Sequence, residues 1–198
     1  KKGCPDDEVV VIMPCDPFTE AGYFETIGRM VKCVEADVAE LVLMGITPTY
    51  PSEKYGYVVP VTDHLMAEGS MAVSKFTENP NVERARELLG MGALWNGGVF
   101  AFRLGYMMEI AQRYVKADSF EAMRSRYSEF PKISFDYEVA EKADSVAVLP
   151  YSGQWKDLGT WNTLTDELHH HIIGNAVMGP RCTNTHVINE LQYPIYVD

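Results

Sequence analysis

The stretch "VVVIMPCD", residues 9–16, decides how the fold is interpreted, because it is apolar for most of its length and ends on a carboxylate. Valine and isoleucine without alternation predict a strand that is buried on both faces of a sheet. A charge at the point where such a strand leaves the sheet is poorly explained by stability. Asp16 is therefore a candidate binding residue, and the alternative is an ordinary turn or capping carboxylate.

The bulk composition indicates a globular protein. The chain has 198 residues, of which 46% are hydrophobic and 23% are charged, which suits one sizeable domain with a small appendage. No apolar run approaches the roughly 20 residues that span a bilayer, so we expect no membrane partner. The opening "KKGCPDDE" lacks the apolar core of a signal peptide, and the four cysteines show no metal-site spacing. We therefore expect a reduced, cytoplasmic setting.

The net charge of −11 limits the possible ligands. Such an acidic protein is a poor nonspecific binder of nucleic acid. If it binds phosphates instead, it must bring local cations, either lysine and arginine side chains or a divalent metal.

Strand-like and helix-like segments alternate along the chain, which predicts an α/β fold with a largely parallel sheet. From Ile172 the texture changes to short strands and turns, so we place a boundary near residue 171. Helices are predicted over residues 22–36, 81–89, 105–115, 119–127 and 134–143, and strands over 40–46, 71–79, 98–104 and 145–151, with an extended segment from Tyr55.

A second carboxylate, Asp157, lies in "WKDLGTW" shortly after the predicted strand "VAVLPY". In open α/β sheets, ligands bind beyond the carboxyl ends of the strands. Mg²⁺ typically takes one or two carboxylates and fills its other positions with water and phosphate oxygens. Asp16 and Asp157 therefore form a candidate metal pair, although each could also be a simple turn residue.

Six motifs occur in one order along residues 8 to 166, and together they resemble the mannose-1-phosphate guanylyltransferases, also called GDP-mannose pyrophosphorylases, among the sugar-phosphate nucleotidyltransferases. Each motif alone is weak, and the series is specific. The motifs are "MPCD", "GITPTYPSEKYGYV", "VSKFTENP", "LWNGGVFAF", "SFDYEVAEKA" and "WKDLGTWNTL".

The resemblance implies a Rossmann-like domain of the glycosyltransferase-A type over residues 1–171, lacking its first nucleotide-binding unit. Residues 172–198 then look like the start of a β-rich C-terminal region. The implied reaction joins GTP and mannose 1-phosphate into GDP-mannose and pyrophosphate. Mg²⁺ held by Asp16 and Asp157 is the implied catalytic centre.

The resemblance also implies a set of sugar contacts. Gly56 matches a glycine whose backbone lies against the sugar, Glu78 a glutamate that bonds sugar hydroxyls, and Asn96 a sugar-contacting asparagine. Gly97 follows Asn96 and is expected to leave room for the ligand. Without the resemblance, these residues are also explained as turn glycines and as solvated or packed polar groups.

The sequence departs from the family pattern in two places. No glycine-rich loop with arginine and lysine precedes the first strand, so the sequence is either a fragment, which we expect, or a naturally truncated chain. We expect the fragment to be inactive alone, and its uncovered sheet edge to pair with another copy as a homo-oligomer or to leave the chain marginally stable. Asn79 stands where the family has a lysine that meets the sugar phosphate, which replaces a charge-assisted contact by a neutral one. Lys156 is the better placed of the lysines that could supply the missing charge.

These departures leave an alternative open. The chain could belong to a catalytically weak homologue that senses nucleotide sugars or regulates a partner subunit, or to a relative that uses another sugar phosphate. Retention of both Asp16 and Asp157 favours the enzyme, because a sensor has less need of a metal pair.

Overall fold

The computed structural model describes residues 3–198, and the chain forms two compact units. The large unit holds the residues up to Cys15 and Thr19–Gln154, and the small unit holds Asp16–Phe18 and Trp155–Asp198. The division therefore falls earlier than the change of sequence texture at residue 172. The reason is that strand β2 (Pro17–Thr19) pairs with strand β8 (Trp155–Asp157).

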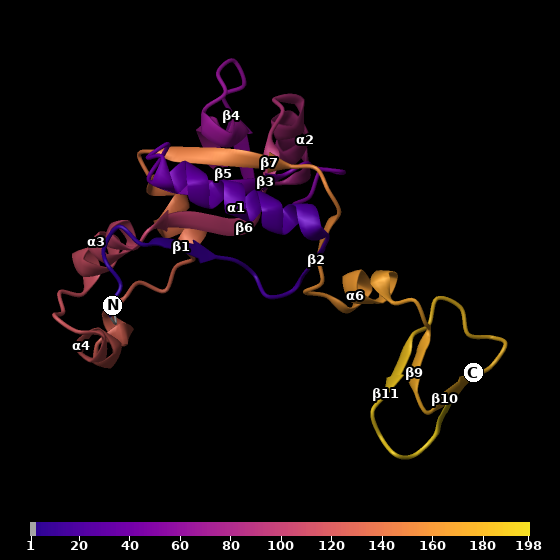
Figure 1. Ribbon diagram of the computed structural model, residues 1–198. Helices are drawn as coiled ribbons and strands as arrows, with labels where there is room; N and C mark the ends of the chain where they lie inside the picture. The colour runs from indigo at the N-terminus through magenta and orange to yellow at the C-terminus, as the bar shows by residue number, and fades with distance from the viewer. Residues whose placement is uncertain (1–2) are drawn as a thin grey trace. The chain divides into compact units, whose positions relative to one another are not determined.

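The large unit is built on a six-stranded sheet (Figure 1). Only β3 and β7 run parallel to each other, and the other pairs in this sheet are antiparallel. In spatial order the strands are β1 (Val9–Ile12), β6 (Leu94–Arg103), β3 (Leu41–Ile46), β7 (Val146–Tyr151), β5 (Met71–Thr77) and β4 (Tyr57–Pro60), and β4 also pairs with the start of β6.

The prediction of a largely parallel sheet is therefore wrong. Parallel neighbours need a crossover of a dozen or more residues, usually through a helix. The link from β4 to β5 holds only a short 3₁₀ turn, Ala67–Gly69, so β5 runs back alongside β4. Helix α2 (Val82–Gly90) then provides a crossover, and β6 keeps the direction of β5. The α/β class itself is confirmed.

Strand β1 corrects the interpretation of "VVVIMPCD". It pairs with β6 at one edge of the sheet, and its residues are half-buried, with Ile12 37% exposed, so the prediction of burial on both faces is wrong. The strand also ends at Ile12, because Pro14 cannot donate to a ladder. Asp16 consequently lies beyond a short loop and belongs to the small unit.

Helices cover the sheet. Helix α1 (Ala21–Glu35) lies across one face, where it packs on β1, β3, β6 and β7 (Figure 1), and it confirms the helix predicted over 22–36. Helices α3 (Leu104–Tyr114) and α4 (Phe120–Ser125) confirm two further predictions. The single helix predicted over 134–143 is instead α5 (Phe135–Glu138) and a 3₁₀ turn, Ala140–Lys142, with Val139 between them at a φ of −114° and a ψ of −59°.

The core joins the sheet to α3 and α5. Leu43 and Phe100 are buried in the cluster, and Met107 of α3 and Phe135 of α5 pack against it. The Phe135 ring lies 4.8 Å from that of Phe100, which fixes the position of α5 on β6. This packing determines where the polar residues of α5 point.

The small unit combines one helix with short strand pairs. Helix α6 (Trp161–Glu167) is capped by Thr160. Further on, β9 (Ile172–Gly174) pairs in parallel with β11 (Val187–Asn189), and β10 (Ala176–Met178) pairs in parallel with β12 (Ile195–Val197). The short strands predicted after Ile172 are confirmed. No helix among residues 3–198 is both long and apolar enough to cross a membrane.

Two glycines make a matched stability prediction. A Cβ at Gly45 of β3 would lie 2.6 Å from both Leu94 Cδ1 and Val148 Cγ2, so Gly45→Ala should destabilise the fold by about 1–3 kcal/mol through overpacking. Gly28 of α1 has no neighbour within 4 Å of a built Cβ, so Gly28→Ala should stabilise by about 0.5–1 kcal/mol. Urea denaturation of both variants measures the difference, and equal effects would contradict this packing.

Candidate functional site

Three of the predicted sugar contacts meet where β4, β5 and β6 adjoin. Tyr57, the first residue of β4, faces Thr77 of β5 on one side and Trp95 of β6 on the other. The residues next to this triple are Gly56, Glu78 and Asn96, and the Asn96 N–H donates to the Gly56 carbonyl at 2.7 Å. Strand register therefore brings together residues that are 22 and 18 positions apart along the chain.

Gly56 is buried, and its missing side chain makes room for Glu78. A Cβ built on Gly56 would overlap Glu78 Oε2 and lie 3.3 Å from Asn96 Cβ. Glycine therefore allows the Glu78 carboxyl group to lie directly against the main chain of β4. The requirement for glycine comes from this contact within the protein.

The surroundings of the Glu78 carboxyl group disfavour its ionised form. Its Oε2 is buried and has no hydrogen-bond partner among the described residues. Burial, helped by the charges of Asp136 and Glu141, raises the pKa of Glu78 to about 7. A polar hydroxyl group placed beside Oε2 would relieve this cost, and strongly shifted carboxyl groups are frequent at binding sites.

The Asn96 side chain is oriented by two neighbours. Its Nδ2 donates to Asp136 Oδ1 of α5 at 2.7 Å, and its Oδ1 accepts from the Gly98 N–H at 3.1 Å. Asp136 was not among the predicted site residues. The signal was present, since Asp136 lies in the motif "SFDYEVAEKA", but only the fold brings that motif to β6.

Gly97 and Asn79 each have a structural reason for their residue type. A Cβ on Gly97 would lie 3.1 Å from Ile46 Cγ1 and from the Met44 carbonyl oxygen, so glycine suits the close approach of β6 to β3. Asn79 has a φ of 44°, in the left-handed region where asparagine is tolerated better than most residues. Their predicted contacts with ligand stay predictions.

An aromatic group adjoins this polar cluster. The rings of Tyr50 and Tyr55 lie 5.0 and 4.9 Å from the ring of Trp95, which is itself buried. Tyr50 remains half exposed. The loop before β4 is thus held against β6 by ring packing, which supports the position of Gly56.

The predicted metal pair lies in the small unit. Asp16 directly precedes β2 and Asp157 ends β8, and these two strands pair. The Leu158 N–H donates to the Asp16 carbonyl at 3.3 Å, so the two aspartates are brought together across neighbouring strands although 141 positions separate them. Asp157 Oδ1 accepts from the Gly159 N–H at 2.8 Å.

The residue types of this predicted pair would suit a cation that needs few protein ligands. A carboxylate has about four lone-pair sites, so one hydrogen bond leaves Asp157 able to bind a metal. No group of three or more histidine, cysteine, aspartate or glutamate side chains suited to a metal occurs among residues 3–198. Mg²⁺ with one or two carboxylates is compatible with that donor set, whereas a site enclosed wholly by protein is not.

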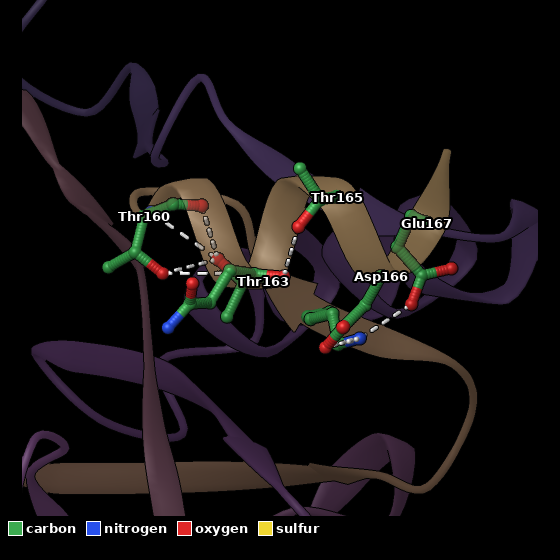
Figure 2. A network of polar contacts seen from close by, with 7 residues as sticks. Thr160, Thr163, Thr165, Asp166 and Glu167 are labelled. Carbon is green, nitrogen blue, oxygen red and sulfur yellow. Dashed lines mark hydrogen bonds and ion pairs between the residues drawn. The ribbon is translucent and has the colours of Figure 1, made fainter. Parts of the chain in front are cut away.

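Lys156 is already paired. Its Nζ lies 2.7 Å from Glu167 Oε1 and 3.3 Å from Asp166 Oδ2, both on α6 (Figure 2). These hydrogen bonds raise the pKa of Lys156, chiefly through Glu167. Two of its three N–H donors are thus used by carboxylates, which also offset its positive charge, and its predicted role as a replacement cation stays a prediction.

A cavity of about 460 Å³ lies away from these residues, where β6 ends and β3 begins. Its lining includes Asp37, Glu40 and Glu109, with Arg103 bonded to Asp37. A phosphate ligand would be repelled by such a lining, so this cavity is not a candidate nucleotide site.

Comparison with known families decides the classification. A family model described as nucleotidyl transferase matches residues 2–172. The chain belongs to the nucleotidyl transferase family. This membership confirms the resemblance indicated by the six sequence motifs.

Individual nucleotidyl transferase relatives agree with this. The alginate biosynthesis protein AlgA of Pseudomonas syringae is 29% identical, over 88% of this chain and 40% of its own length. The mannose-1-phosphate guanylyltransferase ManC of Salmonella typhimurium is 31% identical, over 78% of this chain and 37% of its own length. The chain thus spans about two fifths of these curated relatives.

A solved structure matches the fold. The protein from Thermus thermophilus named mannose-1-phosphate geranyltransferase aligns with a TM-score of 0.69 and 28% identity, over 86% of this chain and 55% of its own. The predicted nucleotidyltransferase fold is therefore confirmed.

The raised pKa of Glu78 gives a pH-dependent stability prediction. Between about pH 4.5 and 7 the folded chain keeps this proton while the unfolded chain loses it, so Glu78 lowers stability progressively as the pH rises through that window. Glu78→Gln mimics the protonated acid. The stability of this variant relative to the native protein should therefore be greater at pH 8 than at pH 5. Thermal unfolding at both pH values tests this.

The matched control is Glu25→Gln, at an exposed position of α1. If Glu78→Gln and the native protein differ by the same amount at both pH values, Glu78 is not held in its neutral form.

The backbone at Asn79 gives a second prediction. Asn79→Lys places a less tolerant residue at a φ of 44° and should lower stability by about 1 kcal/mol, whereas Asn79→Gly should be neutral or stabilising. Urea denaturation of the two variants separates them. A lysine variant as stable as the native protein would show that the backbone does not select the residue here.

Proposed function

We propose that this chain is the sugar-binding part of a nucleotidyltransferase that forms GDP-mannose and pyrophosphate from GTP and mannose 1-phosphate. The chain covers only part of its relatives, so the proposal concerns the complete protein. It deepens the family membership by naming the two substrates.

The observation that carries the proposal is the convergence of Gly56, Glu78 and Asn96. A buried carboxyl oxygen without a partner among the described residues and an oriented amide suit the hydroxyl groups of a sugar, which both donate and accept hydrogen bonds. Relatives named mannose-1-phosphate guanylyltransferase support mannose 1-phosphate as the sugar.

In this reaction the protein would mainly position the substrates and stabilise charge. An oxygen of the sugar phosphate attacks the α-phosphorus of the nucleotide, and pyrophosphate leaves in line. Glu78 and Asn96 would hold the sugar so that its phosphate points at that phosphorus. Such orientation lowers the barrier, because the translational and rotational entropy is lost on binding and not in the chemical step.

The aspartate pair would hold the cofactor. Asp16 and Asp157 fit Mg²⁺, which when bound supplies positive charge to the phosphate oxygens. The need for such charge is large here, because the chain has a net charge of −11 and Asn79 brings none. The role of Asn79 would then be limited to a neutral hydrogen bond with the sugar phosphate.

The other interpretation, a sensor or regulatory homologue, is not favoured by similarity to relatives named as guanylyltransferases. A relative with another sugar phosphate remains an outcome of the assay. The cytoplasmic setting and the homo-oligomer also stay predictions.

The aspartate pair gives the test of function. In the full-length protein, Asp16→Asn and Asp157→Asn should each lower kcat for pyrophosphate release about a hundredfold or more, because each removes a charge that holds the cation. A chelator should abolish turnover, and added Mg²⁺ should restore it. The measurement is pyrophosphate release from GTP with mannose 1-phosphate, and with glucose 1-phosphate for comparison.

The matched control is Asp166→Asn, which removes an aspartate of the same unit that bonds only Lys156 among the described contacts. It should keep near-native turnover. Native rates in Asp16→Asn and Asp157→Asn, with intact folding, would eliminate the metal pair.

A further inference from the structure

We propose that Asp136 is a positioning residue that fixes the Asn96 amide as a hydrogen-bond donor toward a hydroxyl oxygen of the sugar. This inference rests on the proposed function, because it concerns the same site. Asp136 itself need not touch the substrate.

The hydrogen-bond inventory of Asn96 defines the geometry. A side-chain amide has two N–H donors and one carbonyl acceptor. One N–H donates to Asp136 Oδ1 at 2.7 Å, and the carbonyl accepts from the Gly98 N–H at 3.1 Å. These two contacts distinguish the oxygen end of the amide from the nitrogen end. The second N–H is then directed by the plane of the amide and is the group left for a ligand.

Asp136 is held independently of Asn96. It lies on α5, where Ser134 caps the helix by accepting from the Tyr137 N–H. The Phe135 ring packs 4.8 Å from Phe100 and 6.2 Å from Phe102, both on β6. Because Asn96 is on the same strand, the two ends of the Asp136–Asn96 hydrogen bond share one rigid support.

The location of Asp136 has an electrostatic cost. Its carboxylate adds to the burial that disfavours ionisation of Glu78. A residue chosen for stability alone would avoid a second carboxylate there, so its presence indicates a role in fixing the amide. Glu78 as acceptor and Asn96 as donor together would discriminate between the orientations of neighbouring hydroxyl groups on a sugar ring.

Three variants separate position from charge. Asp136→Ala removes the acceptor and should raise KM for mannose 1-phosphate about tenfold or more, with a smaller change in kcat. Asp136→Asn keeps an acceptor oxygen and should raise KM about two- to threefold. The control Glu141→Gln removes the other charge near Glu78 without touching Asn96, and it should leave KM unchanged.

A swap variant distinguishes positioning from a merely structural bond. Asn96→Asp combined with Asp136→Asn restores one hydrogen bond between the two side chains but replaces the donor that faces the ligand by an acceptor. Stability should recover toward the native value while KM stays raised about tenfold or more. If KM recovers with stability, the bond is only structural and the proposal is overturned.

A direct readout does not depend on turnover. In ¹⁵N-labelled protein, the side-chain amide signal of Asn96, assigned by its loss in Asn96→Ala, should show one proton bonded to a carboxylate and exchanging slowly. Exchange should quicken about tenfold or more in Asp136→Ala and remain slow in Glu141→Gln. An unchanged signal in Asp136→Ala overturns the positioning role.

The two proposals can fail separately. If the native full-length protein turns over neither sugar phosphate, the proposed function falls, and the Asn96 signal still decides whether Asp136 orients the amide. If turnover is present and Asp136→Ala, shown to be folded by its thermal unfolding, has native KM, the positioning role falls while the proposed function stands.

Discussion

The pairing of β4 with both β5 and β6 is the constraint on which the candidate sugar site depends. It places Tyr57 between Thr77 and Trp95, and so leaves Gly56, Glu78 and Asn96 as neighbours just outside the pairing. A slip of one residue in either pairing would turn Glu78 or Asn96 to the opposite face of the sheet. The buried Trp95, packed by the rings of the preceding loop, makes such a slip costly. The polar site is thus positioned by apolar packing.

The same cluster shows how binding groups conflict with stability. Burial of Glu78 beside the charge of Asp136 raises its pKa to about 7, and Oε2 lacks a partner among the described residues. Such a cost persists only where the surrounding structure fixes the group, as Gly56 and the anchored α5 do here. A ligand hydroxyl group that satisfies Oε2 would recover part of this cost as binding free energy. The free-energy cost of burying Glu78 without a partner would therefore favour binding of a ligand that carries a hydroxyl group.

The sequence predicted much of the fold through local patterns. Helix α1 follows its apolar spacing, and α2 begins near the start of the segment predicted over 81–89, where Asn81 caps it. Strand direction could not be obtained in this way, because it depends on the short 3₁₀ turn between β4 and β5 and on which strands become neighbours. The burial of β1 was overestimated for a similar reason, since an apolar run does not reveal that a strand lies at an edge. Asp136 was missed because only the packing of Phe135 on β6 brings it to Asn96.

The backbone conformation at Asn79 bears on the charge of the candidate site. A φ of 44° favours asparagine over lysine on conformational grounds, so the lost cation has a local structural explanation that does not require a change of function. The loss of charge must still be offset, because a phosphate bound to a chain of net charge −11 needs a cation. Lys156 is occupied by Asp166 and Glu167, which makes it a weak substitute. Under the proposed function, positive charge would come from a cation held by Asp16 and Asp157, which adjoin the paired strands β2 and β8.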